Sequence, residues 1–389
     1  MCGIAGFCNF KEDFEENTDY WNFRLEKMRA VLAHRGNDAR GRYLKKHIGL
    51  SHSRLAIRDI LCGDQPMTRT HNGYEYTICY NGEIYNTDEL IPELSENGFV
   101  CSTTSDTEVI LYAYIHWGAD FVNRLNGIFA FAIWDAAKNR LLLYRDRVGV
   151  KPLFYAIRGD SLVFGSEPKA CFAHPAVKPE LDKQGLQELL AIGPAHTSGL
   201  SLFKDLFEVL PGHFMIYSRD GLHDETYWEL TSREHTESYQ DTVAHTRFLV
   251  EDAIKRQMVS DVPVCTFLSG GIDSSIVTAI AANYMNTRGK TLNTFSFDFK
   301  DNDRYFKANA FQPERDLPYV NRMLEEYETA HSYLECDENS LFKALFAAVD
   351  AKDMPGMTDV DSSLLYFCSL VSRKNKVALT GECADEIFD

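Results

Sequence analysis

The pattern of expected secondary structure changes near residue 220, and this change limits the possible folds more than any other feature of the sequence. Before it, short segments rich in β-branched and aromatic residues predict strands. These segments are 3–9, 48–57, 74–80, 128–135, 140–147 and 162–167. Helical spacing of apolar residues occurs near 21–33 and 107–117. Many strands with few helices predict layered sheets covered by helices.

Strands and helices alternate in the second half of the chain. Strands are expected at 262–268, 291–299, 331–336 and 377–380, and helices at 274–285, 319–327, 341–350 and 362–373. This alternation is typical of a parallel, doubly wound α/β sheet. The two patterns meet in the polar stretch 221–242, which predicts a domain boundary.

Composition excludes several classes of protein. The 389 residues suffice for two or three domains, and 45% apolar with 25% charged residues excludes a disordered or mainly membrane-embedded chain. A net charge of −17 argues against general nucleic-acid binding. No apolar run is long enough for a membrane span, and no signal peptide opens the chain. Ten separate cysteines, with no C-x-x-C pair, indicate reduced thiols. We expect a cytoplasmic enzyme whose partners include neither nucleic acid nor a membrane.

The second residue of the chain is a cysteine. A residue this small permits removal of Met1, which leaves Cys2 with a free α-amino group. The reference pKa of that amine, about 8, is close to that of a thiol, so one residue can supply both nucleophile and base. An isolated Cys2 is more simply explained as a small buried residue at the start of a strand. The motifs that follow decide between these interpretations.

Six motifs follow one another in the first half of the chain. They are Cys2-Gly3-Ile4-Ala5-Gly6, His34-Arg35-Gly36, Ser53-Arg54-Leu55-Ala56-Ile57, Tyr80-Asn81-Gly82-Glu83-Ile84-Tyr85-Asn86, Ser105-Asp106 and Arg145-Asp146-Arg147-Val148-Gly149. This set resembles the class II glutamine amidotransferase domain, and the resemblance covers roughly the first 220 residues. It implies a layered αββα fold of the type with an N-terminal nucleophile. Asn37 stands where the family usually has proline, and asparagine also suits a turn.

The resemblance implies how glutamine is hydrolysed. Cys2 attacks the side-chain amide, and the Asn81 side chain and the Gly82 backbone N–H stabilise the oxyanion. The simpler interpretation of Asn81-Gly82 alone is a hairpin turn. Together with Cys2 at the terminus, the pair favours catalysis.

The resemblance also implies how glutamine is bound. Arg54 holds the α-carboxylate through a two-pronged contact. Glu83 and Asp106 accept hydrogen bonds from the α-ammonium group. The implied glutamine-binding set is completed by Leu55, Ala56, Ile57, Arg58, Asn81 and Gly82. Taken singly, Arg54 also suits a surface ion pair and Asp106 a helix N-terminus.

A glycine-rich loop follows the first expected strand of the second half. It reads Leu268-Ser269-Gly270-Gly271-Ile272-Asp273-Ser274-Ser275 and precedes an expected helix. Such a loop presents backbone N–H groups to an anion. It lacks the Gly-Lys-Ser/Thr of the usual nucleoside triphosphate loop and resembles the pyrophosphate loop of enzymes that cleave ATP to AMP. The serines can donate to phosphate oxygens, and Asp273 suggests a Mg²⁺ bridge. The alternative is a serine-capped helix after a glycine turn.

A second signature follows the last expected strand. Thr380-Gly381-Glu382-Cys383-Ala384-Asp385-Glu386 resembles a motif of the asparagine synthetase family. The resemblance implies that Asp273 and Asp385 hold Mg²⁺ and that Glu382 assists at the acyl-adenylate centre. It also implies an ATP site formed by Leu268, Ser269, Gly270, Gly271, Asp273, Ser274, Ser275, Phe297, Thr380 and Gly381. Cys383 stands where many relatives have glycine, and it would be strained if the position needs a positive φ.

Over its whole length the chain resembles a glutamine-hydrolysing asparagine synthetase. The expected domains are a type 2 amidotransferase domain at 2–221, a linker at 222–242 and an incomplete synthetase domain at 243–389. The implied reaction uses glutamine, aspartate and ATP with Mg²⁺, forms β-aspartyl-AMP, and yields asparagine, glutamate, AMP and pyrophosphate. A homodimer is one option for its assembly.

Two alternatives remain open at this point. One is a relative that amidates, or closes to a β-lactam, a different carboxylate. The other is a non-catalytic binding protein. Because the sequence stops at Asp389, where the family continues into a helical segment, we also expect this polypeptide to retain only the glutaminase half of the reaction.

Overall fold

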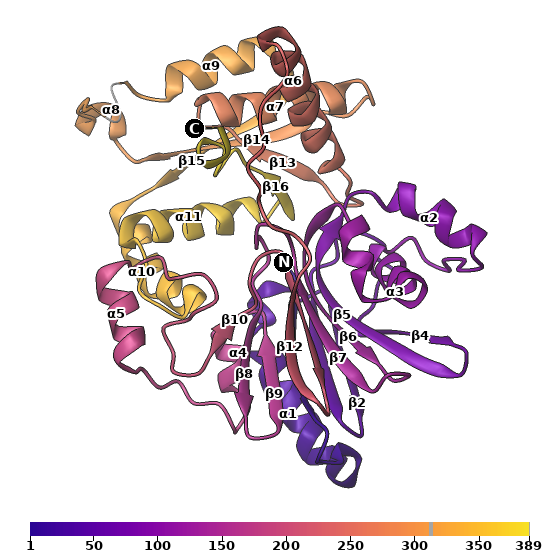
Figure 1. Ribbon diagram of the computed structural model, residues 1–389. Coiled ribbons are helices and arrows are strands. Elements are labelled where there is room, and N and C mark those ends of the chain that lie inside the picture. The colour runs from indigo at the N-terminus through magenta and orange to yellow at the C-terminus, as the bar shows by residue number, and fades with distance from the viewer. Residues whose placement is uncertain (311–313, 389) are drawn as a thin grey trace. The chain divides into compact units, whose positions relative to one another are not determined.

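A computed structural model describes residues 1–310 and 314–388 of the chain (Figure 1). The chain divides into two compact units. Unit 1 comprises Met1–Ser232 with Lys352–Gly356, and unit 2 comprises Arg233–Ala351 with Met357–Asp389. The division after Ser232 falls inside the segment 222–242 that was expected to be a linker. Within the described ranges, no helix combines the length and apolar character that crossing a membrane requires.

Unit 1 contains two antiparallel sheets of six strands each. Sheet 1 has the order β10-β8-β9-β1-β3-β2, and sheet 2 has the order β12-β11-β7-β6-β5-β4. The strands of sheet 1 are β1 (Gly3–Asn9), β2 (Ala39–Lys45), β3 (Ile48–Arg54), β8 (Phe154–Arg158), β9 (Ser161–Gly165) and β10 (Phe207–Glu208). Those of sheet 2 are β4 (Met67–His71), β5 (Tyr74–Ile84), β6 (Gly127–Asp135), β7 (Arg140–Arg145), β11 (His213–Ser218) and β12 (Gly221–Thr226). The helices are α1 (Thr18–Ala30), α2 (Thr87–Glu96), α3 (Asp106–Trp117), α4 (Pro168–Phe172) and α5 (Lys183–Ala191).

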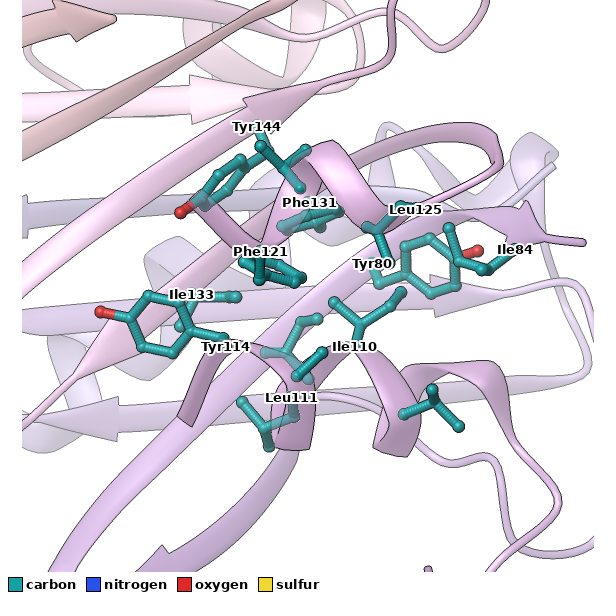
Figure 2. Close-up of a cluster of buried hydrophobic side chains, with 14 of the residues drawn as sticks. Tyr80, Ile84, Ile110, Leu111, Tyr114, Phe121, Leu125, Phe131, Ile133 and Tyr144 are labelled. Carbon is teal, nitrogen blue, oxygen red and sulfur yellow. The ribbon is translucent and has the colours of Figure 1, made fainter. Parts of the chain in front are cut away.

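Alternation along β6 shows why sheet 2 is covered on both faces. Phe129, Phe131 and Ile133 pack with α3, whereas Ala130 and Ala132 pack in the core between the sheets. Successive side chains of a strand point to opposite faces, so a strand that is apolar throughout must be buried on both sides. Figure 2 shows aromatic and aliphatic side chains of sheet 2 meeting those of α3 in this outer core.

The same alternation occurs along β1 of sheet 1. Ile4 and Cys8 belong to the core between the sheets, and Ala5 and Phe7 belong to the outer core. That outer core contains residues of α1 and α4, such as Leu25. Unit 1 therefore has the αββα layers that were expected.

Two of the differences between unit 1 and the sequence-based interpretation affect the candidate site residues. The strand expected at 74–80 continues to Ile84, so Asn81 and Gly82 lie within β5 and the hairpin-turn interpretation is wrong. The strand expected at 48–57 ends at Arg54, which leaves Leu55 to begin a loop.

Unit 2 contains a parallel sheet with the order β15-β14-β13-β16. The strands are β13 (Val264–Phe267), β14 (Leu292–Phe299), β15 (Thr329–Cys336) and β16 (Val377–Leu379). The helices are α6 (Tyr239–Arg256), α7 (Ile272–Asn286), α8 (Asn302–Tyr305), α9 (Leu317–Glu326), α10 (Glu338–Lys352), α11 (Thr358–Val371) and α12 (Asp385–Phe388). Val264 packs with residues of α7 on one face, and Cys265 packs with residues of α11 on the other. This is a doubly wound sheet.

The strand order positions the loops of unit 2. The chain passes from β13 outward to β14 and β15, and then returns to the other side of β13 as β16. In doubly wound sheets the ligand site lies at the carboxyl ends of strands where the order reverses. The glycine-rich loop follows β13 and the Thr380-Gly381 segment follows β16, so both candidate motifs lie at this place.

Candidate active sites

Cys2 lies immediately before β1 and contacts the loop after β3. The Leu55 N–H donates to the Cys2 Sγ at 3.4 Å, and the thiol lies 3.6 Å from the Leu55 carbonyl oxygen. The segment that contains Gly36 packs closely against the end of β3. Only glycine fits there, because an added Cβ would lie 2.3 Å from the carbonyl carbon of Arg54. Burial raises the pKa of the Cys2 thiol, with the Leu55 N–H acting in the opposite direction. The thiol is therefore a poor nucleophile unless a base removes its proton.

Arg35 and Glu167 fix the backbone of Cys2. Arg35 Nε donates to the Cys2 carbonyl oxygen at 2.9 Å, and Arg35 Nη1 lies 2.7 Å from the carboxylate of Glu167. His34 and Lys169 each lie 3.0 Å from that same carboxylate. Burial alone would raise the pKa of Glu167, but its contacts with His34, Arg35 and Lys169 outweigh burial and lower the pKa to about 2.

Asn81 is a buried asparagine whose side-chain nitrogen is unused. Its exposed fraction is 1%, and Nδ2 has no hydrogen-bond partner among the residues that the structure describes. Buried donors are normally paired, so this nitrogen is available to donate to a bound group. Gly82 follows it on β5, and a Cβ there would lie 2.3 Å from the Ile128 carbonyl oxygen. Close packing against β6 thus requires glycine at this position.

The guanidinium of Arg54 is held by the loop that follows it. Its nitrogens donate to the carbonyl oxygens of Arg58, Asp59 and Ile60, at 3.3, 2.5 and 3.2 Å respectively. Arg54 Nη1 also lies 3.1 Å from the carboxylate of Asp64, whose side chain is 77% exposed. The guanidinium is therefore rigidly positioned by backbone carbonyls. A further partner is the carboxylate of Asp64 at the surface, which another carboxylate can replace.

Asp106 is buried at the first turn of α3. Its Oδ2 accepts from the Tyr80 hydroxyl at 2.9 Å and from the Ile84 N–H at 3.1 Å. Arg58 Nη1 lies 4.0 Å from the same oxygen. Burial raises the pKa of Asp106, while Arg58 and the hydrogen bonds from Ile84 and Tyr80 oppose that effect.

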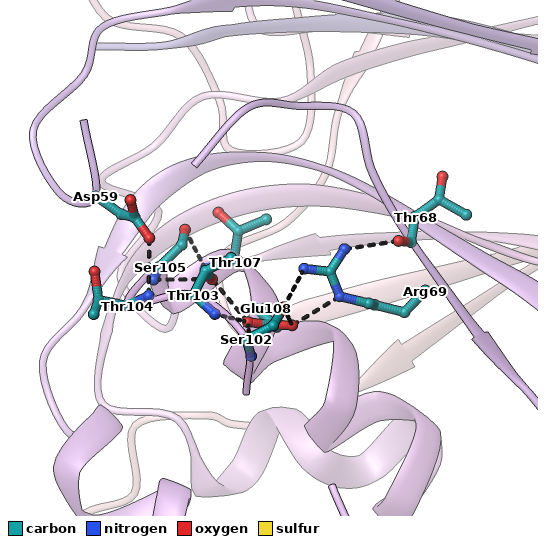
Figure 3. Close-up of polar contacts among 9 residues, drawn as sticks. All are labelled: Asp59, Thr68, Arg69, Ser102, Thr103, Thr104, Ser105, Thr107 and Glu108. Atoms are coloured by element: carbon teal, nitrogen blue, oxygen red, sulfur yellow. Dashed lines mark hydrogen bonds and ion pairs between the residues drawn. The ribbon is translucent and has the colours of Figure 1, made fainter. Parts of the chain in front are cut away.

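A second carboxylate organises the loop before Asp106. Glu108 is fully buried and accepts five hydrogen bonds, and Figure 3 shows this network. Its donors are Ser102 N, Ser102 Oγ, Thr103 N, Thr103 Oγ1 and Arg69 Nε, at 2.7–2.9 Å. Asp59 adds a bond of 2.8 Å from the Thr104 N–H, which ties this loop to the one that holds Arg54. A charged acceptor with five donors fixes the loop that ends in Asp106.

Most of the expected glutamine-site residues line one small cavity of about 30 Å³. The expected members are Cys2, Arg54, Leu55, Ile57, Arg58, Gly82, Glu83 and Asp106. Ala56 is buried outside the lining and donates to Asp38. Asn81 is adjacent to Gly82 but does not itself line the cavity. Sequence reasoning missed Gly63, Gln65, Tyr80, Ser105 and Thr107 as lining residues. Only Tyr80 and Ser105 lie inside motifs that could have indicated them.

The glycine-rich loop of unit 2 turns sharply between β13 and α7. Gly270 has φ +87°, and a Cβ there would lie 2.9 Å from the Asp316 carbonyl oxygen. The hydroxyls of Ser269 and Ser274 lie 2.9 Å apart, and the Ser274 hydroxyl donates to the Gly271 carbonyl oxygen at 3.1 Å. Gly271 is the residue before the first turn of α7. The loop thus leaves the amino end of α7, a helix of 15 residues, open to an anion.

The two loops of unit 2 meet at the expected place. A Cβ on Gly381 would lie 2.7 Å from the Cβ of Asp273, so glycine is required for this approach. A cavity of about 340 Å³ between the loops is lined by Phe267, Ser269, Gly271, Asp273, Ser274, Thr380, Gly381, Glu382, Cys383, Ala384 and Glu386. A neighbouring cavity of about 360 Å³ contains Leu268, Phe297 and Glu382 in its wall. Ser275 and Gly270 line neither cavity, and the side chain of Asp385 lies outside the described residues.

Cys383, which stands where many relatives have glycine, has a positive φ. Its φ is +66°, in the left-handed region that glycine occupies without strain. No group of three or more histidine, cysteine or acidic side chains is arranged for a metal within 1–310 and 314–388. All ten cysteines are free thiols.

Comparisons with known proteins agree on both units. Residues 1–228 match the glutamine amidotransferase domain model, and residues 245–389 match the asparagine synthase model. Asparagine synthetase [glutamine-hydrolyzing] 3 of Bacillus subtilis is 48% identical over 100% of this chain and 63% of its own length. A putative asparagine synthetase of Methanocaldococcus jannaschii is 31% identical over 100% of this chain and 75% of its own. The amidase chyE of Penicillium rubens is 32% identical over 100% of this chain and 59% of its own.

The chain spans 63% of the length of the Bacillus subtilis protein and 59% of the length of the Penicillium rubens protein. Since both domain models match, the comparisons give no support to the expectation that only the glutaminase half is retained.

Proposed function

Because the chain belongs to the family of glutamine-hydrolysing asparagine synthetases, we propose that it makes asparagine from aspartate with ammonia released from glutamine. It is then a carbon–nitrogen ligase with glutamine as amido donor. The main support for the glutaminase half is the buried side-chain nitrogen of Asn81, which has no partner among the described residues and lies on the strand beside the cavity that contains Cys2. A buried donor of this kind is what an oxyanion needs.

The nucleophile in this proposal is the Cys2 thiolate. It attacks the side-chain carbonyl carbon of glutamine, the carbonyl oxygen becomes negatively charged, and the Asn81 amide and the Gly82 N–H donate to it. As this intermediate collapses, the C–N bond breaks and the leaving nitrogen takes the proton that the base accepted from the thiol, so that ammonia departs. The remaining thioester is then hydrolysed by water to glutamate. Arg35 and Glu167 support this step because they hold the Cys2 carbonyl and therefore its backbone.

The base in this proposal is the α-amino group of Cys2 after removal of Met1. Burial lowers the pKa of the Met1 ammonium to about 6, and the charges of Arg35 and Lys151 act in the same direction. Burial acts on the pKa of the Cys2 amine in the same direction, which favours the uncharged form that can take the thiol proton. We therefore expect glutaminase activity to rise with pH as the amine loses its proton.

Recognition of the amino-acid end of glutamine falls to Arg54, Glu83 and Asp106. We propose that the α-carboxylate replaces the exposed Asp64 carboxylate as a partner of Arg54, because the two groups are chemically alike. Leu55, Ile57 and Arg58 complete the wall of the cavity. Asp106→Ala should raise the KM for glutamine, since a partner of the ammonium group is lost.

The synthetase half is proposed for unit 2. ATP binds with its phosphates at the Ser269–Ser275 loop, and the aspartate β-carboxylate attacks the α-phosphate to give β-aspartyl-AMP and pyrophosphate. Ammonia then displaces AMP to form asparagine, with Glu382 near the reacting centre. Leu268, Phe297, Thr380 and Gly381 serve the AMP moiety. The two cavities at the ends of β13 and β16 support this assignment.

Mg²⁺ is proposed as the metal of this site. Asp273 is a hard oxygen ligand at the first turn of α7, and the loop that leads to Asp385 packs directly on it. The metal would neutralise phosphate charge when bound. Asp273→Asn should weaken Mg²⁺-dependent ATP–pyrophosphate exchange and spare glutamine hydrolysis.

A second candidate differs only in the acceptor. Another carboxylate acceptor is the alternative, because a fungal relative that is 32% identical to this chain is named an amidase and not an asparagine synthetase. ATP–pyrophosphate exchange with a panel of carboxylates separates the two, because only the true acceptor stimulates exchange.

Glutamate release by the wild type and not by Cys2→Ala tests the glutaminase half, and no release by the wild type would favour a binding protein. We also propose that the protein is located in the cytoplasm and assembles as a homodimer.

A further inference from the structure

His52 is a fully buried histidine close to the glutamine cavity that the proposed chemistry does not use. It lies on β3, and its partner across the β1–β3 ladder is Ile4. Paired residues of neighbouring strands share a face of the sheet. Because Ile4 packs in the core between the two sheets, His52 also points from sheet 1 toward sheet 2.

One ring nitrogen of His52 contacts the backbone of β5. Nε2 lies 3.1 Å from the Tyr80 carbonyl oxygen. A carbonyl oxygen only accepts, so Nε2 carries the proton in this contact. Burial lowers the pKa of His52 to about 4, and the ring is therefore neutral near pH 7. Nδ1 has no hydrogen-bond partner in the part of the chain that the structure describes.

The contact between His52 and the Tyr80 carbonyl lies on the part of β5 that extends beyond the end of β4. The β4–β5 ladder ends with Met67 opposite Ile78, and Tyr80 lies two residues further along β5. There the Tyr80 N–H donates to the Gln65 Oε1 at 2.6 Å, and the Tyr80 carbonyl accepts from His52. Two side chains thus replace the ladder bonds that a longer β4 would make.

The peptide held in this way is the one that leads to Asn81. The Tyr80 carbonyl and the Asn81 nitrogen belong to a single planar group, so fixing the carbonyl fixes the direction in which Asn81 leaves the strand. The Tyr80 hydroxyl is held separately by Asp106 at 2.9 Å. The oxyanion donor is thereby positioned by bonds to the residue before it, while its own Nδ2 has no hydrogen-bond partner within residues 1–310 and 314–388.

We propose that His52 is a positioning residue for the oxyanion hole, which its Nε2–H bond to the Tyr80 carbonyl keeps in place for the glutaminase reaction. This inference rests on the proposed function, since it assumes that Asn81 donates to an oxyanion. A purely space-filling role for His52 makes a different prediction. Any neutral side chain of similar volume would then serve, whichever of its atoms carries a proton.

Two amide variants of His52 separate these roles. Glutamine reaches about as far as the imidazole Nε2 and can donate to the Tyr80 carbonyl. Asparagine reaches only about as far as Nδ1 and cannot. For His52→Gln we expect a kcat for glutamine hydrolysis within about threefold of wild type. For His52→Asn we expect a kcat lower by about tenfold or more, with the KM changed less than about twofold, because misplacing a reacting group slows the chemical step. Equal kcat values for the two variants would overturn the proposal.

The ring itself provides a test that needs no variant. Nitrogen-15 shifts of His52 in the full-length wild-type chain report which nitrogen is protonated, and assignment needs only a comparison with His52→Gln. We expect the neutral Nε2–H form between pH 6 and about 8. The Nδ1–H form or a charged ring would refute the contact. Activity of the wild type and its loss in Cys2→Ala are measured alongside, so failure of the glutaminase assignment is recognised separately from failure of the role of His52.

Discussion

The guanidinium of Arg35 joins the carboxylate of Glu167, 2.7 Å away, to the backbone of Cys2. Two residues far apart in the sequence therefore hold the start of β1 at the end of β9. Ser166 completes the attachment, because its hydroxyl accepts from the Ile4 N–H at 3.0 Å. The position of the nucleophile is thus a property of the folded sheet and does not depend on the first residues alone.

Glu167→Gln should lower the free energy of unfolding by about 2 kcal/mol at pH 7. The carboxyl pKa is about 2 in the folded chain against a reference value of 4.5. Its contribution is therefore complete above about pH 5 and is lost as the pH falls from 4.5 toward 2. Urea unfolding at several pH values should show the difference between wild type and variant shrinking in that window.

The matched control is Glu93→Gln, which removes the pair between Glu93 of α2 and Arg124, whose side chains are both more than 40% exposed. Because exposed pairs contribute little, we expect a change below about 0.5 kcal/mol. A Glu167 effect that is as small as the Glu93 effect, or that grows on acidification, would contradict the role given to this carboxylate.

Asn81→Ala should abolish most glutamine hydrolysis without destabilising the fold. The kcat should fall by about 10²–10³-fold, the usual effect of removing one oxyanion donor. The Asn81 Nδ2 makes no hydrogen bond to the described residues, so little bonding is lost from the unliganded protein. Steady-state glutamate release and thermal unfolding measure the two effects.

Asn86 is the matched control for this change. It is also buried, but its amide donates to the Arg124 carbonyl at 2.9 Å and its oxygen accepts from the Asn126 N–H at 2.8 Å. Asn86→Ala should therefore destabilise the fold by about 1–3 kcal/mol and leave kcat nearly unchanged in the protein that remains folded. The reverse pattern for the two asparagines would show that Asn81 is structural.

Glu108→Gln should raise the KM for glutamine by about tenfold, because a neutral amide cannot accept the same five bonds and the loop that ends in Asp106 loosens. The effect on kcat should be smaller, since Cys2 and Asn81 lie on other elements. Glutamine saturation curves at constant pH provide the measurement. A change confined to kcat, with the KM unaltered, is incompatible with this account.

The layers of unit 1 were predictable because its central strands are apolar on both faces. Along β6, phenylalanines alternate with alanines, and only burial between two layers accommodates both sets. Edge strands gave no such signal. The strand β2 (Ala39–Lys45) reads Ala-Arg-Gly-Arg-Tyr-Leu-Lys and is half exposed, so its pairing with β3 decides its structure and its own pattern does not.

The chemical groups of the site were predictable where they fall within contiguous motifs. Cys2 and Asn81 belong to such motifs, and so do the loops that meet at Asp273 and Gly381. The supporting side chains were not predictable, because their partners are set by the tertiary fold. Gln65 acts on a residue 15 positions away and Glu108 on one 39 positions away. Nothing in the local pattern distinguishes these residues from ordinary polar ones.

Two adjacent glycines of the loop after β13 should respond oppositely to the same substitution. Gly270 has φ +87°, and an added Cβ would lie 2.9 Å from both the Asp316 carbonyl oxygen and the Tyr319 Cβ. Gly271 precedes α7 with φ −69°, and the nearest atom to an added Cβ is the Ser269 hydroxyl at 3.5 Å. Gly270→Ala therefore combines a left-handed backbone with a steric clash, whereas Gly271→Ala meets neither.

We expect Gly270→Ala to destabilise unit 2 by about 2–3 kcal/mol and Gly271→Ala to change its stability by less than about 1 kcal/mol. Urea unfolding followed by a probe in unit 2 measures both values. Glutamine hydrolysis should be the same in the two variants, because the proposed glutaminase residues all lie in unit 1. Equal stability of the two alanine variants would mean that the loop does not adopt the left-handed turn at Gly270, and the anion site formed by the amino end of α7 would then lose its structural basis.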